Sequence, residues 1–125
     1  MPQKEDRSAI VILVVDGEVV ARNLTASRLH REGYTVLAAA HGKEALELLR
    51  TYDGTVDLLI ADMDLAKIDG QTLWEAAAAE RPGIRSCAVS ADESAGARAA
   101  ESRVPFLLKP LDPELLRRQF ADILS

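Results

Sequence analysis

Four apolar runs in the sequence end at side chains that could act together on a phosphoryl group. These side chains are Asp16, Asp62, Ser90 and Lys109. The carboxyl ends of parallel strands face the crevice in which open α/β sheets bind ligands, so the four would meet there if the runs are parallel strands. Two carboxylates, a hydroxyl and an ammonium suit a phosphoryl group that is held together with a divalent metal ion.

Asp62 is the most informative of these four residues. It ends the apolar run 56–61 and opens the polar stretch 62–70, DMDLAKIDG. An aspartate just past a buried parallel strand faces the ligand crevice. We therefore take Asp62 as the centre of the candidate site.

Short apolar runs alternate with segments of helical spacing along the chain. The predicted strands lie at about 10–15, 34–39, 57–61, 86–90 and 105–108. The predicted helices lie at about 18–32, 43–51, 71–80, 94–102 and 113–124. The strands lack a clean alternation of apolar and polar residues, which is typical of a parallel sheet covered by helices on both faces. The pattern predicts an α/β fold, a doubly wound five-stranded parallel sheet with five helices.

Two of the predicted helices carry boundary signals. The first should end at Gly33, because glycine suits the position that follows a helix. The side chains that the first helix is expected to bury are Val20, Leu24 and Leu29. The last helix has Asp112 as its N-cap and Pro113 at its first helical position. Its apolar face is expected to consist of Leu116, Phe120 and Ile123.

The composition indicates one soluble, acidic domain over residues 1–125, with its core at about 10–124. A chain of 125 residues can bury roughly two thirds of its unfolded surface. The net charge of -5 argues against direct nucleic-acid binding. The single cysteine, Cys87, excludes a disulfide framework and favours a reducing compartment. No apolar run approaches a membrane span and MPQKEDRS is too polar for a signal peptide, so we expect a cytoplasmic protein.

Four motifs, each at a predicted strand end, carry a resemblance to a known family. They are the segment 14–18, VVDGE; Asp62 followed by Asp69 and Gly70; the segment 89–91, VSA; and the segment 106–110, FLLKP. With these motifs the chain resembles a response-regulator receiver domain of bacterial two-component signalling, from about residue 10 to 124. The resemblance implies the flavodoxin-like strand order 2-1-3-4-5, which would bring Asp16 and Asp62 together at the switch point of the sheet.

The resemblance also implies a role for each site residue. Asp62 would be the phosphoacceptor, taking a phosphoryl group from a sensor histidine kinase or a phosphotransfer protein. Mg²⁺ (or Mn²⁺) would be held by Asp16, the Asp62 carboxylate and the backbone carbonyl of Asp64. Lys109 would place its ammonium on the phosphoryl oxygens. Ser90 would donate its hydroxyl to another phosphoryl oxygen and draw its loop inward, which is the expected conformational switch.

The chain departs from the family pattern at three places. The family usually has two adjacent acids after the first strand, and here the second is Gly17. One carboxylate for the metal is therefore missing, and Glu18 or Asp64 would be its partial substitute. Phe106 occupies the aromatic switch position, where tyrosine is common, and has no hydroxyl. Ala66 stands where a proline is usual, which predicts a looser loop after the phosphoacceptor.

Receivers normally signal through the segment between the last two strands, and this segment also departs from the family pattern. It is a few residues shorter than is usual, and its helix at 94–101 is alanine-rich and interrupted by Gly96. A glycine inside a helix costs about 1 kcal/mol relative to alanine. Two site residues also have an ordinary interpretation here, because Ser90 could cap this helix and Lys109 could be a surface lysine.

Other polar, aromatic and sulfur-bearing residues are expected to be structural. His30 and His41 have no companion ligand and should be solvated, and Cys87 should be a small core residue. Residues 69–70, Asp-Gly, should form a turn before the helix near 71. For Trp74 two placements stay open, burial against the sheet or membership of a partner surface.

Three functions fit these patterns. The preferred one is a phosphoacceptor receiver that signals through a conformational switch and catalyses only its own phosphotransfer and autodephosphorylation. It would act on a downstream protein partner, with no direct nucleic-acid or membrane contact and with homodimerisation left open. The alternative, favoured by Gly17, is a degenerate receiver that acts as a phosphorylation-independent protein-binding module. The third reads residues 62–64 as the DxD motif of a phosphohydrolase, but that class typically places the motif after the first strand and needs a larger chain.

Overall fold

A five-stranded parallel sheet forms the centre of the protein in this computed structural model, which describes residues 4–65, 67–68 and 71–124. Its strands are β1 (Val11–Val15), β2 (Thr35–Ala39), β3 (Leu58–Asp62), β6 (Arg85–Ser90) and β7 (Phe106–Leu108). They lie in the order β2-β1-β3-β6-β7, and all neighbouring pairs are parallel. Counted in chain order within this sheet, that is the order 2-1-3-4-5. The predicted fold class is confirmed.

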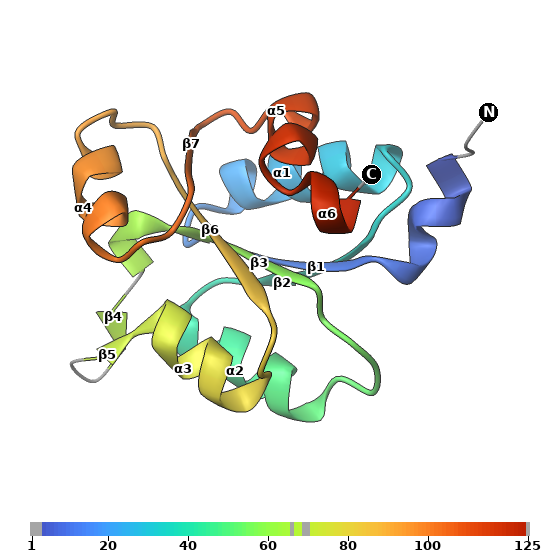
Figure 1. Cartoon of the computed structure of the whole chain (residues 1–125), viewed down its shortest axis with the longest axis horizontal. Helices are drawn as coiled ribbons and strands as arrows, with labels where there is room; N and C mark the ends of the chain where they lie inside the picture. The colour runs from blue at the N-terminus through green and yellow to red at the C-terminus, as the bar shows by residue number, and fades with distance from the viewer. Residues whose placement is uncertain (1–3, 66, 69–70, 125) are drawn as a thin grey trace.

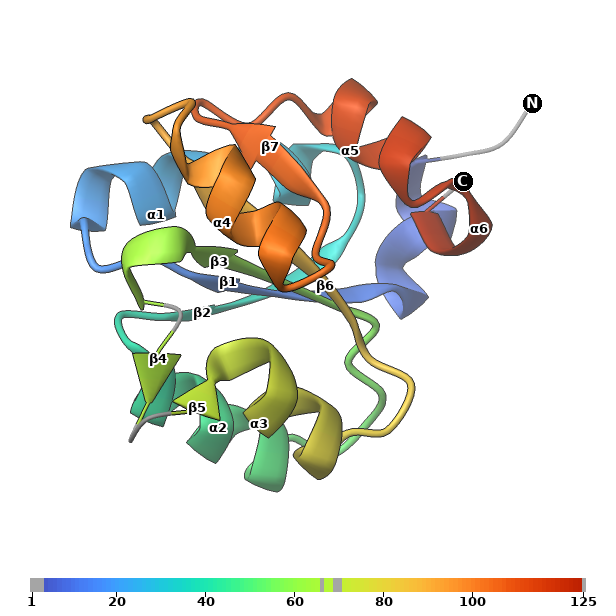
Figure 2. The ribbon, with the colours of Figure 1, turned by 60° about the vertical axis from the view of Figure 1, so that its left-hand side comes forward.

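Helices cover both faces of this sheet, as Figure 1 shows. The α-helices are α1 (Val19–Arg31), α2 (Gly42–Thr51), α3 (Leu73–Glu80), α4 (Ala95–Glu101), α5 (Pro113–Gln119) and α6 (Ala121–Leu124). The short elements are the 3₁₀ helices η1 (Lys4–Ala9) and η2 (Met63–Leu65) and the hairpin of β4 (Lys67–Ile68) with β5 (Gln71–Thr72). Helices α1, α5 and α6 lie on one face and α2 and α3 on the other in both views (Figures 1 and 2). None of the helices in the described ranges is long and apolar enough to cross a membrane.

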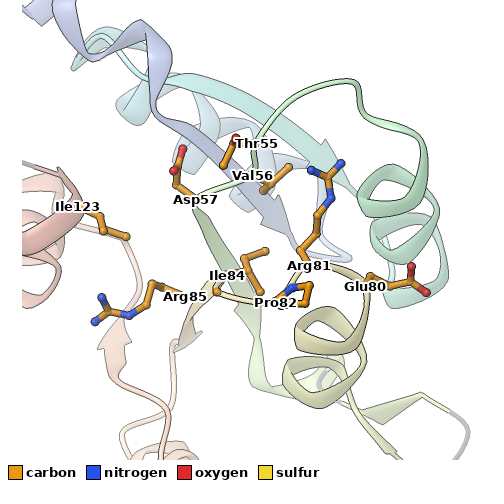
Figure 3. Close-up of a pocket in the computed structure, with 10 residues that line it drawn as sticks. Thr55, Val56, Asp57, Glu80, Arg81, Pro82, Ile84, Arg85 and Ile123 are labelled. Atoms are coloured by element: carbon orange, nitrogen blue, oxygen red, sulfur yellow. The ribbon is translucent and has the colours of Figure 1, made fainter.

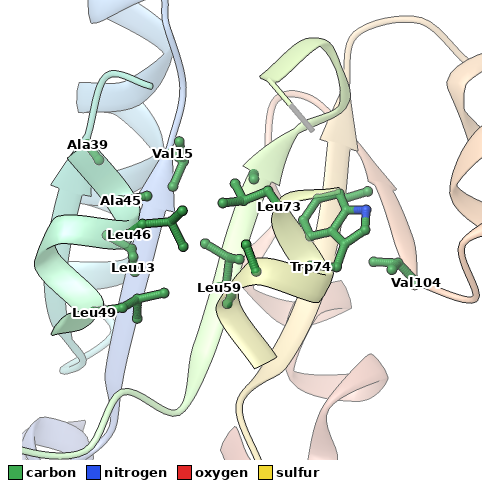
Figure 4. Packing of buried hydrophobic residues seen from close by; sticks show 14 of the residues in the cluster. Leu13, Val15, Ala39, Ala45, Leu46, Leu49, Leu59, Leu73, Trp74 and Val104 are labelled. Atoms are coloured by element: carbon green, nitrogen blue, oxygen red, sulfur yellow. The ribbon is translucent and has the colours of Figure 1, made fainter. Parts of the chain in front are cut away.

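Alternate residues of the central strands feed two separate apolar cores. In β1, Leu13 packs with the core beneath α2 and α3, whereas Ile12 packs with the core beneath α1 and α5. In β3, Leu59 and Ile60 divide in the same way. Successive side chains of a strand point to opposite faces, so a strand covered on both sides must be apolar at every position. Figure 4 shows the first core, with Leu13 and Leu59 between the helices and the sheet.

The first helix packs on the sheet through a different stripe from the one predicted. Leu29 is buried as expected, but Val20 and Leu24 are 69% and 41% exposed, so that part of the prediction was wrong. The buried partner of Leu29 is Thr25, four residues earlier. Residues four apart share a helix face, and Val20 and Leu24 form a second stripe rotated from the first. The predicted stop at Gly33 is confirmed, since this glycine has φ +98 and its N–H donates to the carbonyl of residue 30.

The last predicted helix starts as expected but is divided in two. Asp112 caps α5 by accepting the N–H of residue 114, and a proline follows it. The helix breaks at Phe120, whose φ of -121 and ψ of 43 are not helical, and resumes as α6. Leu116 and Phe120 are fully buried, whereas Ile123 is only half-buried and Leu124 takes the core position instead.

The break has a visible use at the end of the chain. The Tyr34 hydroxyl, buried just before β2, donates to the carbonyl of Leu124 at 2.8 Å. A straight helix through Phe120 would place that carbonyl elsewhere, so the change of direction lets α6 close the second core against Tyr34.

The structure answers most of the remaining structural predictions. Trp74 is buried in the core of α2 and α3, so the first of its two placements is correct. Cys87 is fully buried, and burial raises the pKa of its thiol to about 12. His30 is exposed, while His41 caps α2 by accepting the N–H of residue 44. The predictions for residue 66 and for residues 69–70 lie outside the described residues.

Candidate functional site

The two central strands bring the predicted aspartates together. β1 and β3 are direct neighbours, with Val15 opposite Ala61 in the register. Asp16 and Asp62, each one residue further on, therefore lie side by side at the carboxyl edge of the sheet. Both are largely shielded from solvent, with side chains 5% and 13% exposed.

Lys109 joins the two carboxylates. Its Nζ lies 2.6 Å from Asp16 Oδ2 and also donates to Asp62 Oδ2. The backbone N–H of Lys109 donates to the Ser90 carbonyl at 2.9 Å, which continues the pairing of β6 and β7 and fixes the reach of the ammonium. The prediction that these residues converge is correct, and Lys109 is not an ordinary surface lysine.

Electrostatics keep this lysine charged. Burial lowers the pKa of Lys109, but the hydrogen bonds and charges of Asp16 and Asp62 more than offset that effect, so its pKa is raised above the usual value. One ammonium between two carboxylates leaves a single net negative charge at the centre of the site. A cluster of this kind attracts a further cation, or an anionic group that arrives together with one.

Asp16 is held from several sides by the loop after β1. Its N–H donates to the Ala39 carbonyl at 3.1 Å, and its Oδ1 accepts the N–H of Glu18 at 3.0 Å. In addition, Arg22 Nη1 donates to the backbone carbonyl of Asp16 at 2.8 Å. Sequence reasoning missed Arg22. The one feature of the sequence that could have indicated it is the position of this cation, four residues after Glu18. That spacing places Arg22 one helical turn further on, at the start of α1.

The second oxygen of the Asp62 carboxylate is used by its own loop. Asp62 Oδ1 accepts the N–H of Asp64 at 2.7 Å, which folds the chain into η2 directly after β3. An aspartate that bonds the backbone two residues on is a common turn former. Here that turn orients the Asp62 carboxylate toward Lys109 and leaves Asp64 exposed.

Ser90 ends β6 beside this cluster and is buried. Its Oγ accepts the N–H of Asp92 at 3.0 Å, and Asp92 in turn accepts the N–H of Ser94 at 3.0 Å. These bonds form the loop that enters α4, so the ordinary interpretation of Ser90 as a residue that organises the helix entry is partly correct. A hydroxyl that accepts one hydrogen bond can still donate another.

Phe106 lies beneath α4. It is half-buried against the core of α2 and α3, and a Cβ added at Gly96 would lie 3.3 Å from its Cδ2. The glycine that weakens α4 therefore makes room for the aromatic ring at the predicted switch position.

Gly17 leaves the site with few acidic side chains. Glu18 and Asp64 are exposed, and no group of three histidine, cysteine or acidic side chains that could hold a metal ion occurs in the part of the chain that the structure describes. A Cβ at Gly17 would meet only the Ala40 carbonyl at 3.6 Å and a leucine side chain at 3.9 Å, which are ordinary contacts. Two converging carboxylates still suit a hard cation such as Mg²⁺, which binds one or two carboxylates and keeps several waters.

Comparison with known protein families identifies a match over most of the chain. The family described as response regulator receiver domain matches residues 12–121.

Curated relatives are similar over nearly the whole chain. The sensor kinase CckA of Brucella abortus (strain 2308) is 36% identical over 121 residues, which are 94% of this chain and 13% of CckA. The transcriptional regulatory protein GlrR of Escherichia coli (strain K12) is 32% identical over 117 residues, which are 91% of this chain and 26% of GlrR. The chain thus spans about an eighth to a quarter of the length of these relatives.

Solved structures match the same region. The receiver domain of the hybrid histidine kinase CckA is 31% identical with a TM-score of 0.67, over 92% of this chain and 99% of that one. The structure of the P1 domain of CheA3 in complex with CheY6 from R. sphaeroides is matched at 26% identity with a TM-score of 0.76, over 93% and 97% of the two chains.

Proposed function

Since the chain belongs to the response-regulator receiver family and is a receiver domain of two-component signalling, we propose that Asp62 is its phosphoacceptor. The single observation that carries the proposal is the position of Lys109, whose ammonium contacts the carboxylates of both Asp16 and Asp62 at the carboxyl edge of the sheet. A buried carboxylate with a fixed ammonium beside it can approach an anionic phosphoryl group, because part of the repulsion is already offset.

The donor in this proposal is a phosphohistidine of a sensor histidine kinase or a phosphotransfer protein. A carboxylate oxygen of Asp62 attacks phosphorus, the bond from phosphorus to the histidine nitrogen breaks, and that nitrogen leaves with the electron pair and takes up a proton. The product is an acyl phosphate on Asp62. The partner class is supported by relatives, since CckA is named a sensor kinase and CheY6 is described in complex with the P1 domain of CheA3.

A divalent cation completes the site in this proposal. Asp16, Asp62 and the backbone carbonyl of Asp64 would hold Mg²⁺ or Mn²⁺, with Glu18 as an additional acid. When bound, the cation would offset the negative charge that gathers where the phosphoryl group meets the carboxylate. The reduced number of carboxylates predicts weak binding, because Gly17 supplies none.

Ser90 and Phe106 would convert phosphorylation into a change of shape. The Ser90 hydroxyl would donate to a phosphoryl oxygen, which competes with its present bond to the N–H of Asp92. A shift of this loop would move the entry of α4, and Phe106 would follow because its ring lies against Gly96. The signal would then pass to a downstream protein. Catalysis would be limited to phosphotransfer onto Asp62 and hydrolysis of its own acyl phosphate, in the cytoplasm.

Intact mass spectrometry tests the acceptor directly. After incubation with acetyl phosphate and Mg²⁺, we expect the mass of one added phosphoryl group in the wild type and none in Asp62→Asn. Asp64→Asn is the matched control, because its exposed side chain is at most a partial substitute for the missing metal ligand, so this variant should still be labelled. A label that persists in Asp62→Asn would refute the assignment.

A second candidate function, a phosphorylation-independent binding module with the same fold, is favoured by Gly17. It predicts that neither metal nor acetyl phosphate changes the protein. Titration with Mg²⁺ followed by Trp74 fluorescence separates the two functions, since the buried indole should change its fluorescence only if the cation binds. Absence of both the fluorescence response and the label would favour the binding module.

A further inference from the structure

A hollow between η2, α3 and α4 has the features of a ligand site that the proposed phosphotransfer does not use. Its volume is about 480 Å³. Its floor includes Met63 and Trp74, which are both buried, and its rim is formed by Arg98, Glu101 and Ser102 of the α4 segment, which are exposed.

Trp74, which lines this hollow, carries an unsatisfied donor. Trp74 is 7% exposed, and its Nε1 is the one buried side-chain nitrogen or oxygen without a hydrogen-bond partner among the residues that the structure describes. An indole nitrogen can only donate, and leaving a buried donor unpaired costs about 1–3 kcal/mol. Figure 4 shows this nitrogen on the side of the ring that faces away from Leu73. The neighbouring hydroxyl, that of Thr72, already donates to Glu75 and accepts from it.

A second hollow, at the opposite edge of the sheet, lacks this feature. It lies among the residues shown in Figure 3 and has a volume of about 350 Å³. Its charged groups are already paired: Arg81 donates to the carbonyls of Leu49 and Tyr52, Arg85 contacts Asp122, and Asp57 accepts the N–H of residue 11. Among its described lining residues, no buried side-chain nitrogen or oxygen lacks a hydrogen-bond partner.

We propose that the hollow over Trp74 binds a small neutral molecule with an apolar, planar body and a hydrogen-bond acceptor such as a carbonyl oxygen. Nε1 itself is buried, so a shift of the exposed rim side chains opens the way by which the acceptor takes the Trp74 Nε1–H bond, and the body packs on Met63 and the indole. The volume lies in the lower part of the range of small-molecule sites, about 300–1,000 Å³. The lining carries two acids, Asp64 and Glu101, against one cation, Arg98, so it does not select an anion.

This site shares a residue with the phosphoacceptor loop. Asp64 lines the hollow, and its backbone N–H bonds Asp62 Oδ1 at 2.7 Å. A molecule in the hollow therefore contacts the turn that orients the Asp62 carboxylate. The binding itself does not depend on phosphorylation and can be measured without it.

NMR of the ¹⁵N-labelled protein tests the proposal. Trp74 is the one tryptophan of the chain, so it gives a single indole N–H resonance. The probes are acetophenone, its counterpart without an acceptor, ethylbenzene, and its anionic counterpart, benzoate. Acetophenone should move the indole resonance in a saturable way. Ethylbenzene should bind about tenfold more weakly, the effect of one lost hydrogen bond, and benzoate should also be weaker than acetophenone.

Two serine variants at the ends of α4 control for the site. Ser102→Phe, which adds a ring at the rim, should abolish the acetophenone response. Ser94→Phe, at an exposed position that does not line the hollow, should leave it unchanged. The proposal is overturned if acetophenone does not move the indole resonance, or if the response is equal in Ser102→Phe. Equal binding of ethylbenzene would remove the role of the Trp74 donor, and tighter binding of benzoate would refute the preference for a neutral molecule.

Discussion

At the scale of single residues, the charge balance of the site depends on Lys109. Its ammonium contacts both Asp16 and Asp62, so two negative charges are offset by one positive charge before any ligand arrives. A receiver with the usual pair of acids after its first strand would carry one more negative charge. Gly17 should therefore weaken the cation binding that we propose for this site.

Replacement of Gly17 by aspartate should restore the affinity for metal. A Cβ at this position meets only ordinary contacts, so the side chain can be added without displacing the backbone. We expect Gly17→Asp to bind Mg²⁺ about tenfold more tightly than the wild type, measured by calorimetry, because an additional carboxylate joins the oxygen ligands. Gly17→Asn has nearly the same shape without the charge and should show little gain. Equal affinities of the wild type and Gly17→Asp would mean that Glu18 or Asp64 already supplies the ligand.

The buried thiol of Cys87 predicts a dependence of stability on pH. Burial raises the pKa of Cys87 from 9.0 to about 12, so the folded chain keeps a proton that the unfolded chain releases from about pH 9 upward. The contribution is fully present below pH 9 and is lost between pH 9 and 12, by up to about 1.4 kcal/mol per pH unit. Urea unfolding of the wild type and Cys87→Ala from pH 8 to 11 checks this. The difference between their free energies of unfolding should shrink as the pH rises, and a constant difference would contradict the prediction.

At the scale of elements, Gly96 and Phe106 act as a pair. Alanine in place of a helical glycine normally stabilises a helix by about 1 kcal/mol. At Gly96 the added methyl would lie 3.3 Å from Phe106 Cδ2, which is tighter than an ordinary contact and requires the ring to shift.

Gly96→Ala should therefore stabilise the protein by less than about 1 kcal/mol, the full propensity gain. In a Phe106→Ala background the crowding is removed, and the same substitution should recover that gain. Chemical unfolding of the four proteins of this double-mutant cycle gives the coupling between the two positions. If Gly96→Ala raises the free energy of unfolding by the same amount in both backgrounds, the Phe106 ring does not crowd the added methyl group.

Which elements could be predicted from the sequence depends on whether their signals were local. The five strands follow from short, mainly apolar runs such as 56–61, and the site follows from the polar residues that end or follow four of them. The stripe of α1 that faces the sheet could not be chosen, since Val20 with Leu24 and Thr25 with Leu29 are both spaced four apart. The break at Phe120 accompanies a bond from the distant Tyr34 hydroxyl to Leu124, and the bond of Arg22 to the Asp16 carbonyl depends on how a loop turns. Neither contact has a periodic signal.

At the scale of the whole molecule, the site connects four strands of the sheet at one edge. Lys109 at the end of β7 contacts Asp16 after β1 and Asp62 at the end of β3, and its N–H bonds the carbonyl of Ser90 at the end of β6. A group that draws the ammonium away from the two carboxylates therefore changes contacts on β1, β3 and β7 at once. The loop into α4 begins at the same point, so a local event at Asp62 can reach the surface formed by α4 and β7.

Removal of the Lys109 ammonium should separate phosphorylation from this change of shape. We expect Lys109→Ala to be labelled by acetyl phosphate to a reduced extent, because the carboxylate nucleophile remains. The backbone NMR shifts of residues 90–101 should then move much less on labelling than in the wild type, since no side chain ties the phosphoryl group to β7. Lys43→Ala, which removes an exposed lysine from α2, is the matched control and should behave as the wild type. Wild-type shifts in labelled Lys109→Ala would assign the coupling to Ser90 alone, because that residue is the other polar side chain whose loop leads directly into α4.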